Sequence, residues 1–521
     1  MFDYKQYGHT VLRPIDKWKD IARDDYIFYN HSKDESEFKD NIRIGMNVAH
    51  GHKAVITGIV KKYWDCFCKE GAKRPILSYE FAIDTGTAKP VCCRKTRYGP
   101  YESKIMMDQI KALLKNDWIE RCEGPWGSCI VLAAKPHQEN IADIDDFIWR
   151  MCVSYRKLNS ITKPFEFPIP RCDDAIAILD TGSQFIWIIS LDARQGYHQV
   201  RVRFVDREKL AFFGPDGYKY TFKVMPFGPT NAPGFYSAMM QNLKEEWDTL
   251  FLCRLQEIKH LNDQKITVNI TMEAFIGEKQ LVFGTKIIID DILLWCSNVD
   301  ALFIYFECIC RIFRKYRVSF RLDKCDFMKP RVEYVGHDIT NDGNCPASSK
   351  FDMINNWLLP ERGESLFSFI GLINFYHRYA PYMEIRLKPL RRFLKVYYRK
   401  TIPIMAWSPD LITLFEELKV TLTSSPILAR FVPEKPTFLK TDWSAEGMGW
   451  ILMQPADDVD SVRATKTLPD TGNCLFDLCK DGPRLQPVQF GSRSCTDFER
   501  KYHSFVGEAA ASRWAISQNR H

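Results

Sequence analysis

An apolar stretch interrupted by two acids near the middle of the chain constrains the fold most strongly. Residues 286–295 (KIIIDDILLW) contain two short runs of β-branched or apolar side chains, separated only by Asp290 and Asp291. Such runs joined by two polar residues predict a β-hairpin with both carboxylates at its turn. A third acid, Asp192, ends the continuous apolar run of residues 185–191 (FIWIISL). We therefore expect one carboxylate at a strand end and two more on an adjacent hairpin.

Three carboxylates in this arrangement suit a pair of magnesium ions. Mg²⁺ is usually held by a few carboxylates, several waters and substrate phosphates. Nucleotidyl transfer uses two such ions roughly 4 Å apart, which activate a 3′-hydroxyl and neutralise the leaving pyrophosphate. An Asp-Asp turn taken alone is more often a solvated turn, because short motifs frequently occur by chance. The interpretation therefore depends on the surrounding segments.

The surrounding pattern alternates between helical and strand-like segments. A stripe of apolar side chains predicts a helix over residues 101–115. The further predictions are strands at 128–134, 148–155 and 436–440, helices at about 235–247 and 366–379, and a polar insertion at about 252–280. The chain of 521 residues is too long for one compact core, so several domains are expected.

The order of these segments resembles the Pol region of Ty3/gypsy-class long-terminal-repeat retrotransposons over about residues 78–521. Six blocks carry the resemblance: residues 149–159 (WRMCVSYRKLN), 191–199 (LDARQGYHQ), 209–212 (KLAF), 224–233 (VMPFGPTNAP), 288–292 (IIDDI) and 334–337 (YVGH). Six blocks in the right order are strong evidence, although no single block would be. The resemblance implies an α+β right-hand polymerase that acts as an RNA-directed DNA polymerase, or reverse transcriptase.

The resemblance also implies roles for individual residues. Asp192, Asp290 and Asp291 would be the catalytic, metal-binding acids for two Mg²⁺ ions, with Mn²⁺ as a substitute. The nucleotide-binding residues would be Tyr197, Arg150, Lys135, Phe227 and Gly228. Tyr197 matches the aromatic that would clash with a ribose 2′-hydroxyl, and Arg150 would place a guanidinium on the triphosphate. The alternative for these two and for Phe227 is core packing or a surface ion pair.

Two substitutions depart from the family pattern. Ile288 stands where the box of the family has Tyr, and Ser154 replaces an Asp that is usual in the fingers strand. Neither substitution removes a metal ligand.

A second group of acids resembles the start of a ribonuclease H domain. Residues 438–442 (FLKTD) and 444–449 (SAEGMG) match its first strand, and Glu508 matches a second acid on a helix. That fold uses four acids, and Asp442 and Glu508 are the two that match. We therefore expect a truncated, inactive ribonuclease H remnant, with exposed acids on a remnant fold as the equal alternative.

The predicted domain order follows from the resemblance. We expect an N-terminal segment of unknown role (1–77), fingers (78–170), palm (171–300), thumb (301–360), connection (361–430) and an incomplete ribonuclease H-like α/β domain (431–521). The partners would be an RNA or DNA template-primer and deoxynucleoside triphosphates, with no membrane involved. The oligomeric state is left open.

Composition permits this interpretation without requiring it. The net charge of +7 is compatible with nucleic acid but equally with other partners. The 17 cysteines lack the paired spacing of zinc sites, which favours reduced thiols inside a cell. No apolar run approaches the roughly 18 residues of a membrane span. We expect an intracellular protein, in a cytoplasmic particle or the nucleus.

Two rival functions remain. Asp84-Thr-Gly86 and Asp470-Thr-Gly472 invite an aspartic protease interpretation, but their surroundings do not form the matching hairpins that such a pair of aspartates needs. The stronger rival is a decayed or co-opted element that binds nucleic acid without polymerising.

Overall fold

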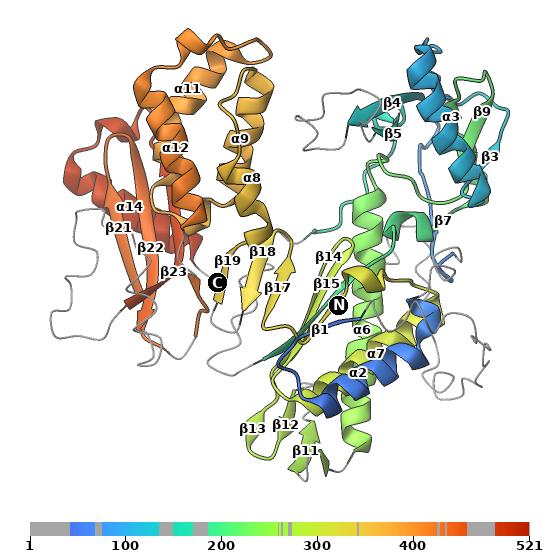
Figure 1. Ribbon diagram of the computed structural model, residues 1–521, viewed down its shortest axis with the longest axis horizontal. Coiled ribbons are helices and arrows are strands. Elements are labelled where there is room, and N and C mark those ends of the chain that lie inside the picture. Colours follow the sequence, from blue (N-terminus) through green and yellow to red (C-terminus); the bar gives the residue numbers. More distant parts are fainter. Residues whose placement is uncertain are drawn as a thin grey trace. The chain divides into compact units, whose positions relative to one another are not determined.

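The computed structural model describes residues 42–67, 75–134, 149–169, 186–258, 260–261, 264–268, 273–340, 343–424, 428–432, 435–455 and 485–519. These residues form two compact units, one containing the described residues up to Lys329 and one beginning at Pro330. The sequence colours of Figure 1 distinguish the two units, blue to yellow-green for the first and yellow to red for the second. Each unit is described by itself below.

A five-stranded sheet forms the centre of the first unit. Its strand order is β1 (Arg43–Ile44), β16 (Asp326–Phe327), β6 (Trp187–Asp192), β15 (Asp291–Cys296) and β14 (Phe283–Ile288). β14 and β15 form the predicted hairpin, and β15 also pairs antiparallel with β6. β1 adds a short parallel strand at the edge next to β16.

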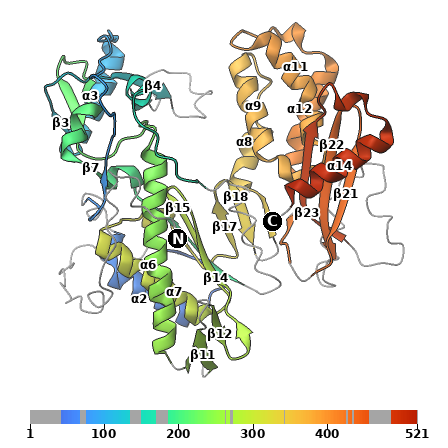
Figure 2. The ribbon, with the colours of Figure 1, turned by 180° about the vertical axis from the view of Figure 1, so that it is seen from behind.

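Two helices pack against this sheet, α6 (Ala232–Glu257) and α7 (Val299–Tyr316), and α2 (His50–Lys62) packs against α7. Figure 2 shows the long helix α6 on the near side of the strands. α6 continues about ten residues beyond the predicted end near 247, because Phe251 and Leu255 extend the buried helical stripe begun by Trp247. The ring of Trp247 meets Phe313 of α7 edge to face, with centroids 5.2 Å apart.

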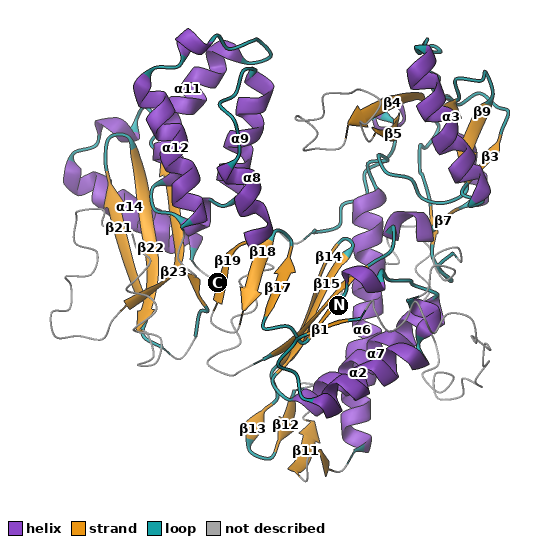
Figure 3. Cartoon of the chain, viewed as in Figure 1, coloured by secondary structure: helices purple, strands orange, loops and turns teal. Residues whose placement is uncertain are grey.

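The segment expected to be only a polar insertion carries its own structure. Its first residues complete α6, and the rest forms a small antiparallel sheet of β10 (His260–Leu261), β11 (Gln264–Val268), β12 (Ala274–Ile276) and β13 (Lys279–Gln280). Figure 3 shows β11 to β13 as orange strands beside the lower end of α6.

The remaining elements of the first unit lie before and between these strands. The predicted helix at 101–115 is α3 (Pro100–Lys115), and the two strands predicted around residues 137–147 are the hairpin β4 (Cys129–Ala134) and β5 (Trp149–Ser154). The others are η3 (Trp64–Cys66), β2 (Glu80–Phe81), β3 (Ile119–Arg121), α4 (Arg156–Asn159), η6 (Gly196–Gln199), β7 (Arg201–Val202), η7 (Phe204–Leu210), β8 (Phe212–Phe213), β9 (Lys219–Phe222) and η8 (Leu322–Lys324).

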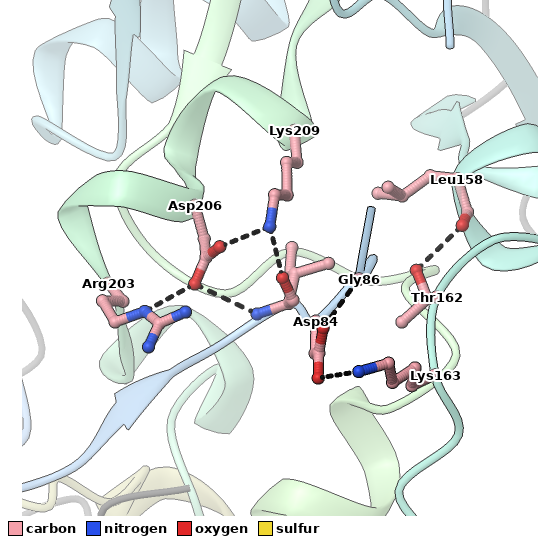
Figure 4. Close-up of polar contacts among 9 residues, drawn as sticks. Asp84, Gly86, Leu158, Thr162, Lys163, Arg203, Asp206 and Lys209 are labelled. Atoms are coloured by element: carbon pink, nitrogen blue, oxygen red, sulfur yellow. Dashed lines mark hydrogen bonds and ion pairs between the residues drawn. The ribbon is translucent and has the colours of Figure 1, made fainter. Parts of the chain in front are cut away.

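A buried ion cluster ties η7 to the segment that follows β2 (Figure 4). The carboxylate of Asp206 is 1% exposed and accepts hydrogen bonds from Arg203 Nε and Lys209 Nζ, both at 2.7 Å. It also accepts from the backbone N–H of Ile83 at 3.2 Å. Because two cations and an amide surround this carboxylate, its burial is compensated. Lys209, the first residue of the third block (residues 209–212), therefore has a structural role in this cluster.

The second unit contains two sheets and a group of helices. One sheet has the order β17 (Arg331–Tyr334), β18 (His337–Thr340), β19 (Gly343–Pro346) and β20 (Leu428–Ala429); the other has the order β21 (Phe438–Trp443), β22 (Gly447–Pro455) and β23 (Leu485–Ser494). The helices are η9 (Ser348–Lys350), α8 (Phe351–Asn355), α9 (Gly363–Phe375), η10 (His377–Tyr379), α10 (Met383–Arg386), α11 (Lys388–Tyr397), η11 (Ile404–Ala406), α12 (Pro409–Thr423), η13 (Glu499–Lys501) and α14 (Ser504–Gln518).

The division between the units differs from the predicted domain boundary at residue 300. Residues 301–329, expected to open the thumb, lie in the first unit. α7 packs against β15, and β16 hydrogen-bonds to β6 within the central sheet. Residues 301–329 belong to the first unit because α7 buries an apolar face there, which includes Phe306, Ile309 and Phe313. None of the described helices has the length and apolar character that a bilayer span requires.

Candidate active site

The three acids from the sequence meet at one end of the central sheet. Asp192 ends β6 and Asp291 begins β15, and the antiparallel register places them directly opposite each other. Cross-strand partners lie on the same face of a sheet, roughly 5 Å apart at Cβ. Asp290 occupies the turn of the β14–β15 hairpin, where its carbonyl accepts a 2.9 Å hydrogen bond from the N–H of Ala193.

The hairpin turn is conformationally strained. Ile289 has a φ of +53°, in the left-handed region that β-branched residues rarely adopt. A two-residue hairpin turn favours Gly or Asn at such a position, so Ile289 costs about 1–2 kcal/mol. The pairing of Ile288 with Asp291 on one side and of Asp291 with Asp192 on the other holds the turn in place. Strain of this kind is typical of functional turns.

The carboxylate of Asp290 lies in an unfavourable environment for a negative charge. Burial, and then the charges of Asp291 and Asp192, raise the pKa of Asp290 to about 7, against an opposing effect of Lys324. Its buried Oδ1 has no hydrogen-bond partner among the described residues. A buried oxygen without a partner is costly, so this side chain is suited to a cation that the protein itself does not supply.

Two cations act on Asp192, Lys324 and Arg321. Lys324 Nζ lies 3.6 Å from Asp192 Oδ2, and the N–H of Arg321 donates to the Asp192 carbonyl at 2.9 Å. Burial raises the pKa of Asp192, while Lys324 and Arg321 lower it. The positive charge of Lys324 thus partly offsets the negative charges of Asp192 and Asp290.

The acid set fits a divalent cation by its chemistry. Hard carboxylate oxygens come from β6, from β15 and from the turn before β15, and Oδ1 of Asp290 in that turn is buried without a hydrogen-bond partner among the described residues. Within the described ranges, no group of three or more His, Cys, Asp or Glu side chains already stands at metal-holding distances. Mutual repulsion of like charges opposes such close approach until a cation is present.

Gly196 and Tyr236 complete the surroundings of Asp290 and were missed from the sequence. A Cβ at Gly196, which begins η6, would overlap both Asp290 Oδ1 and the hydroxyl of Tyr236. Tyr236 is fully buried on α6. The sequence signal that could have revealed this contact is Gly196 itself, because side chains can approach the backbone so closely only at a glycine.

Three of the predicted nucleotide-binding residues lie together beside the acids. The ring of Tyr197 stacks on Phe227 with centroids 4.9 Å apart and contacts Tyr236 at 5.4 Å. Burial and the charge of Asp290 raise the pKa of Tyr197 to about 12, so its hydroxyl stays protonated. Phe227 is 56% exposed, and Gly228 has a φ of +110° that suits glycine alone.

The other two predicted nucleotide contacts are not joined to this group. Arg150 is exposed on β5, opposite Ala133 of β4, and none of the described contacts links it to the three acids. Lys135 lies outside the described residues.

The acids of the predicted ribonuclease H remnant come together in the second unit. Asp442 is exposed on β21, where it pairs with Gly449 of β22. Glu508 projects from α14, and its Oε1 accepts a 3.4 Å hydrogen bond from the N–H of Trp443. The two acids are therefore neighbours, as their resemblance to one site predicts.

The aspartic protease alternative gains no geometric support. Asp84 Oδ1 accepts a 2.8 Å hydrogen bond from the N–H of Gly86, and Asp84 Oδ2 pairs with Lys163 Nζ at 3.0 Å (Figure 4). Asp84 therefore serves a local turn and an ion pair. Asp470 lies outside the described residues.

Comparisons with known proteins agree with the fold. A family model described as reverse transcriptase (RNA-dependent DNA polymerase) matches residues 148–339, and one described as an RNase H-like domain found in reverse transcriptase matches residues 407–465. The second match begins ahead of the boundary predicted at residue 431.

Two retrotransposon polyproteins are similar to most of the chain. The retrovirus-related Pol polyprotein from transposon 297 of Drosophila melanogaster is 24% identical over 470 residues, covering 89% of this chain and 37% of the relative. The transposon Tf2-3 polyprotein of Schizosaccharomyces pombe is 25% identical over 391 residues, covering 75% of this chain and 25% of the relative. The chain thus spans between a quarter and two fifths of the length of these relatives.

Solved structures show the same fold at low identity. The foamy viral protease-reverse transcriptase in complex with an RNA/DNA hybrid has a TM-score of 0.67 at 17% identity and covers 93% of this chain and 55% of that chain. Its form in complex with double-stranded DNA has a TM-score of 0.68 at 18% identity, covering 93% and 71%. The mixed α/β fold is that of these reverse transcriptases, and the reverse transcriptase family model matches residues 148–339. The chain is thus a reverse transcriptase with a reverse transcriptase-associated RNase H-like domain, related to the Ty3/gypsy-type retrotransposon Pol polyproteins.

Proposed function

We propose that this chain is an RNA-directed DNA polymerase, with Asp192, Asp290 and Asp291 holding two Mg²⁺ ions. The supporting observation is the buried, unpartnered Oδ1 of Asp290, in a carboxyl group whose pKa is raised by burial and by the other two acids. Bound Mg²⁺ would polarise the α-phosphate and increase the acidity of the primer hydroxyl. The right-hand arrangement, with residues 78–170 as fingers and 171–300 as palm, belongs to the same proposal.

The protein contributes position and shape to this reaction. The cross-strand pairing of β6 and β15 fixes Asp192 and Asp291, and the strained turn at Ile289 fixes Asp290. A rigid arrangement lowers the barrier because the charges need no reorganisation during reaction. Gly196 leaves room for the Asp290 carboxylate beside the Tyr236 hydroxyl.

The stacked pair of Tyr197 and Phe227 would form the wall against which the sugar of the incoming nucleotide lies. Tyr197 is only 5% exposed and is backed by Tyr236, so its ring cannot retreat from a ribose 2′-hydroxyl. Gly228 would extend this wall, and the exposed guanidinium of Arg150 would reach the triphosphate. Deoxynucleoside triphosphates and a primed RNA or DNA template are the proposed substrates.

Primer extension tests the proposal directly. With poly(rA)·oligo(dT), dTTP and Mg²⁺, the full chain is expected to lengthen the primer, and chelation of Mg²⁺ by excess EDTA is expected to stop the reaction. Product length on a sequencing gel is the measurement. Retention of the primer-template in a gel-shift assay without any extension would instead favour the non-catalytic element, which the Ile288 substitution also favours.

Tyr197 is expected to set the preference for deoxynucleotides. A Tyr197→Val substitution should raise incorporation of UTP relative to dTTP by roughly 10- to 200-fold, because it removes the group that excludes the 2′-hydroxyl. The measurement is kcat/KM for each nucleotide on one primer-template. Tyr197→Phe keeps the ring and is the matched control, which should retain the preference. Equal preference in all three proteins would contradict this role.

A further inference from the structure

Tyr382 of the second unit adopts a conformation that its residue type disfavours. It precedes α10 with φ +55° and ψ +25°, in the left-handed region. A bulky L-residue adopts this region only when surrounding contacts compensate, whereas Gly and Asn do so readily. The residues that follow are anchored, since Met383 and Leu387 are fully buried and the N–H of Glu384 donates to Ser492 Oγ on β23 at 3.0 Å.

The ring of Tyr382 lies directly on the strand beside Asp442. A Cβ built on Gly449 would stand 2.6 Å from Cε1 and 2.7 Å from Cδ1 of Tyr382, so any larger residue would displace the ring. Gly449 is the cross-strand partner of Asp442 in the β21–β22 ladder. The glycine therefore creates the space in which the tyrosine covers the strand next to the acid.

The hydroxyl of Tyr382 engages the acid itself. Burial, followed by the charge of Asp442 and a hydrogen bond to its carboxylate, and then by the charge of Glu508, raises the pKa of Tyr382 to about 12. The hydroxyl thus remains a donor at neutral pH, and Asp442 is its acceptor. Glu508 accepts in turn from the N–H of Trp443.

This acid pair differs from the one on the central sheet of the first unit. Asp290 has a buried oxygen without a partner among the described residues, whereas Asp442 and Glu508 both have protein donors. Because its ring lies against the cross-strand partner of Asp442, Tyr382 stands beside the acid that a divalent cation would have to reach.

We propose that Tyr382 is a built-in cover of the RNase H-like domain, which closes the Asp442–Glu508 pair to divalent cations until the tyrosine swings away. The strained backbone at Tyr382 keeps the ring on Gly449, and the hydroxyl bond holds the Asp442 carboxylate. The inference concerns the second unit alone and does not rest on the proposed polymerase function. A purely structural tyrosine would pack on the strand without controlling access of a cation to the acids.

Iron-directed cleavage of the backbone distinguishes these two roles by position. Fe²⁺ replaces Mg²⁺ in the full chain, ascorbate and hydrogen peroxide generate hydroxyl radicals at bound iron, and mass spectrometry locates the cuts. Tyr382→Asn removes the ring and hydroxyl while Asn still tolerates the left-handed backbone. Tyr398→Asn, at an exposed tyrosine beyond α11, is the matched control.

The expected result is at least a fivefold rise in cuts near residues 442 and 508 in Tyr382→Asn, with the wild type and Tyr398→Asn at background. Adding Asp442→Asn to Tyr382→Asn should remove the new cuts. Thermal unfolding of each variant verifies that it is folded. Equal cleavage near residue 442 in the wild type and Tyr382→Asn, whether high or absent, would overturn the proposal. Cuts near residues 192 and 290 report separately on the first unit.

Discussion

An Asp290→Asn variant is expected to lose about 10³-fold or more of its primer-extension rate and to unfold at the same temperature as the wild type or a higher one. The loss follows from removing one metal-binding charge, since a metal ion contributes several kcal/mol of transition-state stabilisation and each 1.36 kcal/mol corresponds to tenfold in rate. The unchanged or higher stability follows from the pKa of Asp290, which burial and the neighbouring acids raise to about 7. A raised pKa means that folding disfavours the charged carboxylate, and Asn carries no charge.

The pairing of these two measurements makes the result specific. Single-turnover primer extension and thermal unfolding are recorded on the same preparations, with Asp108→Asn as the matched control. Asp108 is an exposed acid on α3 that forms a surface ion pair with Lys111, so both quantities should stay at wild-type values. Retained extension in Asp290→Asn would remove this acid from the proposed centre. A fall of unfolding temperature large enough to melt the variant at the assay temperature would show that Asp290 is structural.

A Gly196→Ala substitution is expected to reduce extension by about 10²-fold, because misplacing a reacting group by about 1 Å has that effect. Gly196 does not have a positive φ, so Ala is compatible with its backbone, and the effect comes from space alone. The new methyl group would overlap Asp290 Oδ1 and the Tyr236 hydroxyl, and one of them must shift. Overpacking of this kind also lowers the free energy of unfolding by about 1–3 kcal/mol.

Gly58→Ala provides the matched control for this prediction. Gly58 lies within α2, and a Cβ there meets nothing within 4 Å. Ala is the better helix former, so this control should keep full activity and gain up to about 1 kcal/mol in the free energy of unfolding. Denaturant unfolding and primer extension measure both variants. If Gly196→Ala behaves like Gly58→Ala, the crowding around Asp290 has no functional meaning.

Local patterns predicted the secondary structure of the centre well. The β14–β15 hairpin, α3, β4, β5, β6 and β21 all occur where alternation or helical spacing placed them. These elements depend on residues that are close in the sequence, so the local sequence pattern is enough to predict them. The family resemblance, carried by six ordered blocks, is confirmed by the comparisons.

Features that depend on distant residues escaped prediction. The contact of Gly196 with Asp290 joins residues 94 positions apart in the chain, and nothing in the local sequence names the partner. The left-handed Tyr382 was missed because neither its residue type nor its neighbours signal that conformation. α6 was predicted too short, because polar residues after Trp247 obscured the buried stripe on its other face.

The roles of individual site residues stay predictions. The geometry gathers Tyr197, Phe227 and the three acids, whereas Arg150 stands apart from them on β5. The guanidinium is therefore the weakest part of the proposed nucleotide site.

The N-terminal strand and helix determine how far a recombinant fragment of the first unit can be truncated. β1 hydrogen-bonds to β16, and the side chain of Phe67 packs against Phe320 with ring centroids 5.6 Å apart. Asp65 and Lys62 add ion pairs to α7. A recombinant fragment trimmed to the matched residues 148–339 would lose all of these, leaving β16 with a bare strand edge and α7 with an uncovered apolar flank. Such edges promote aggregation, so expression boundaries for the first unit belong before Arg43.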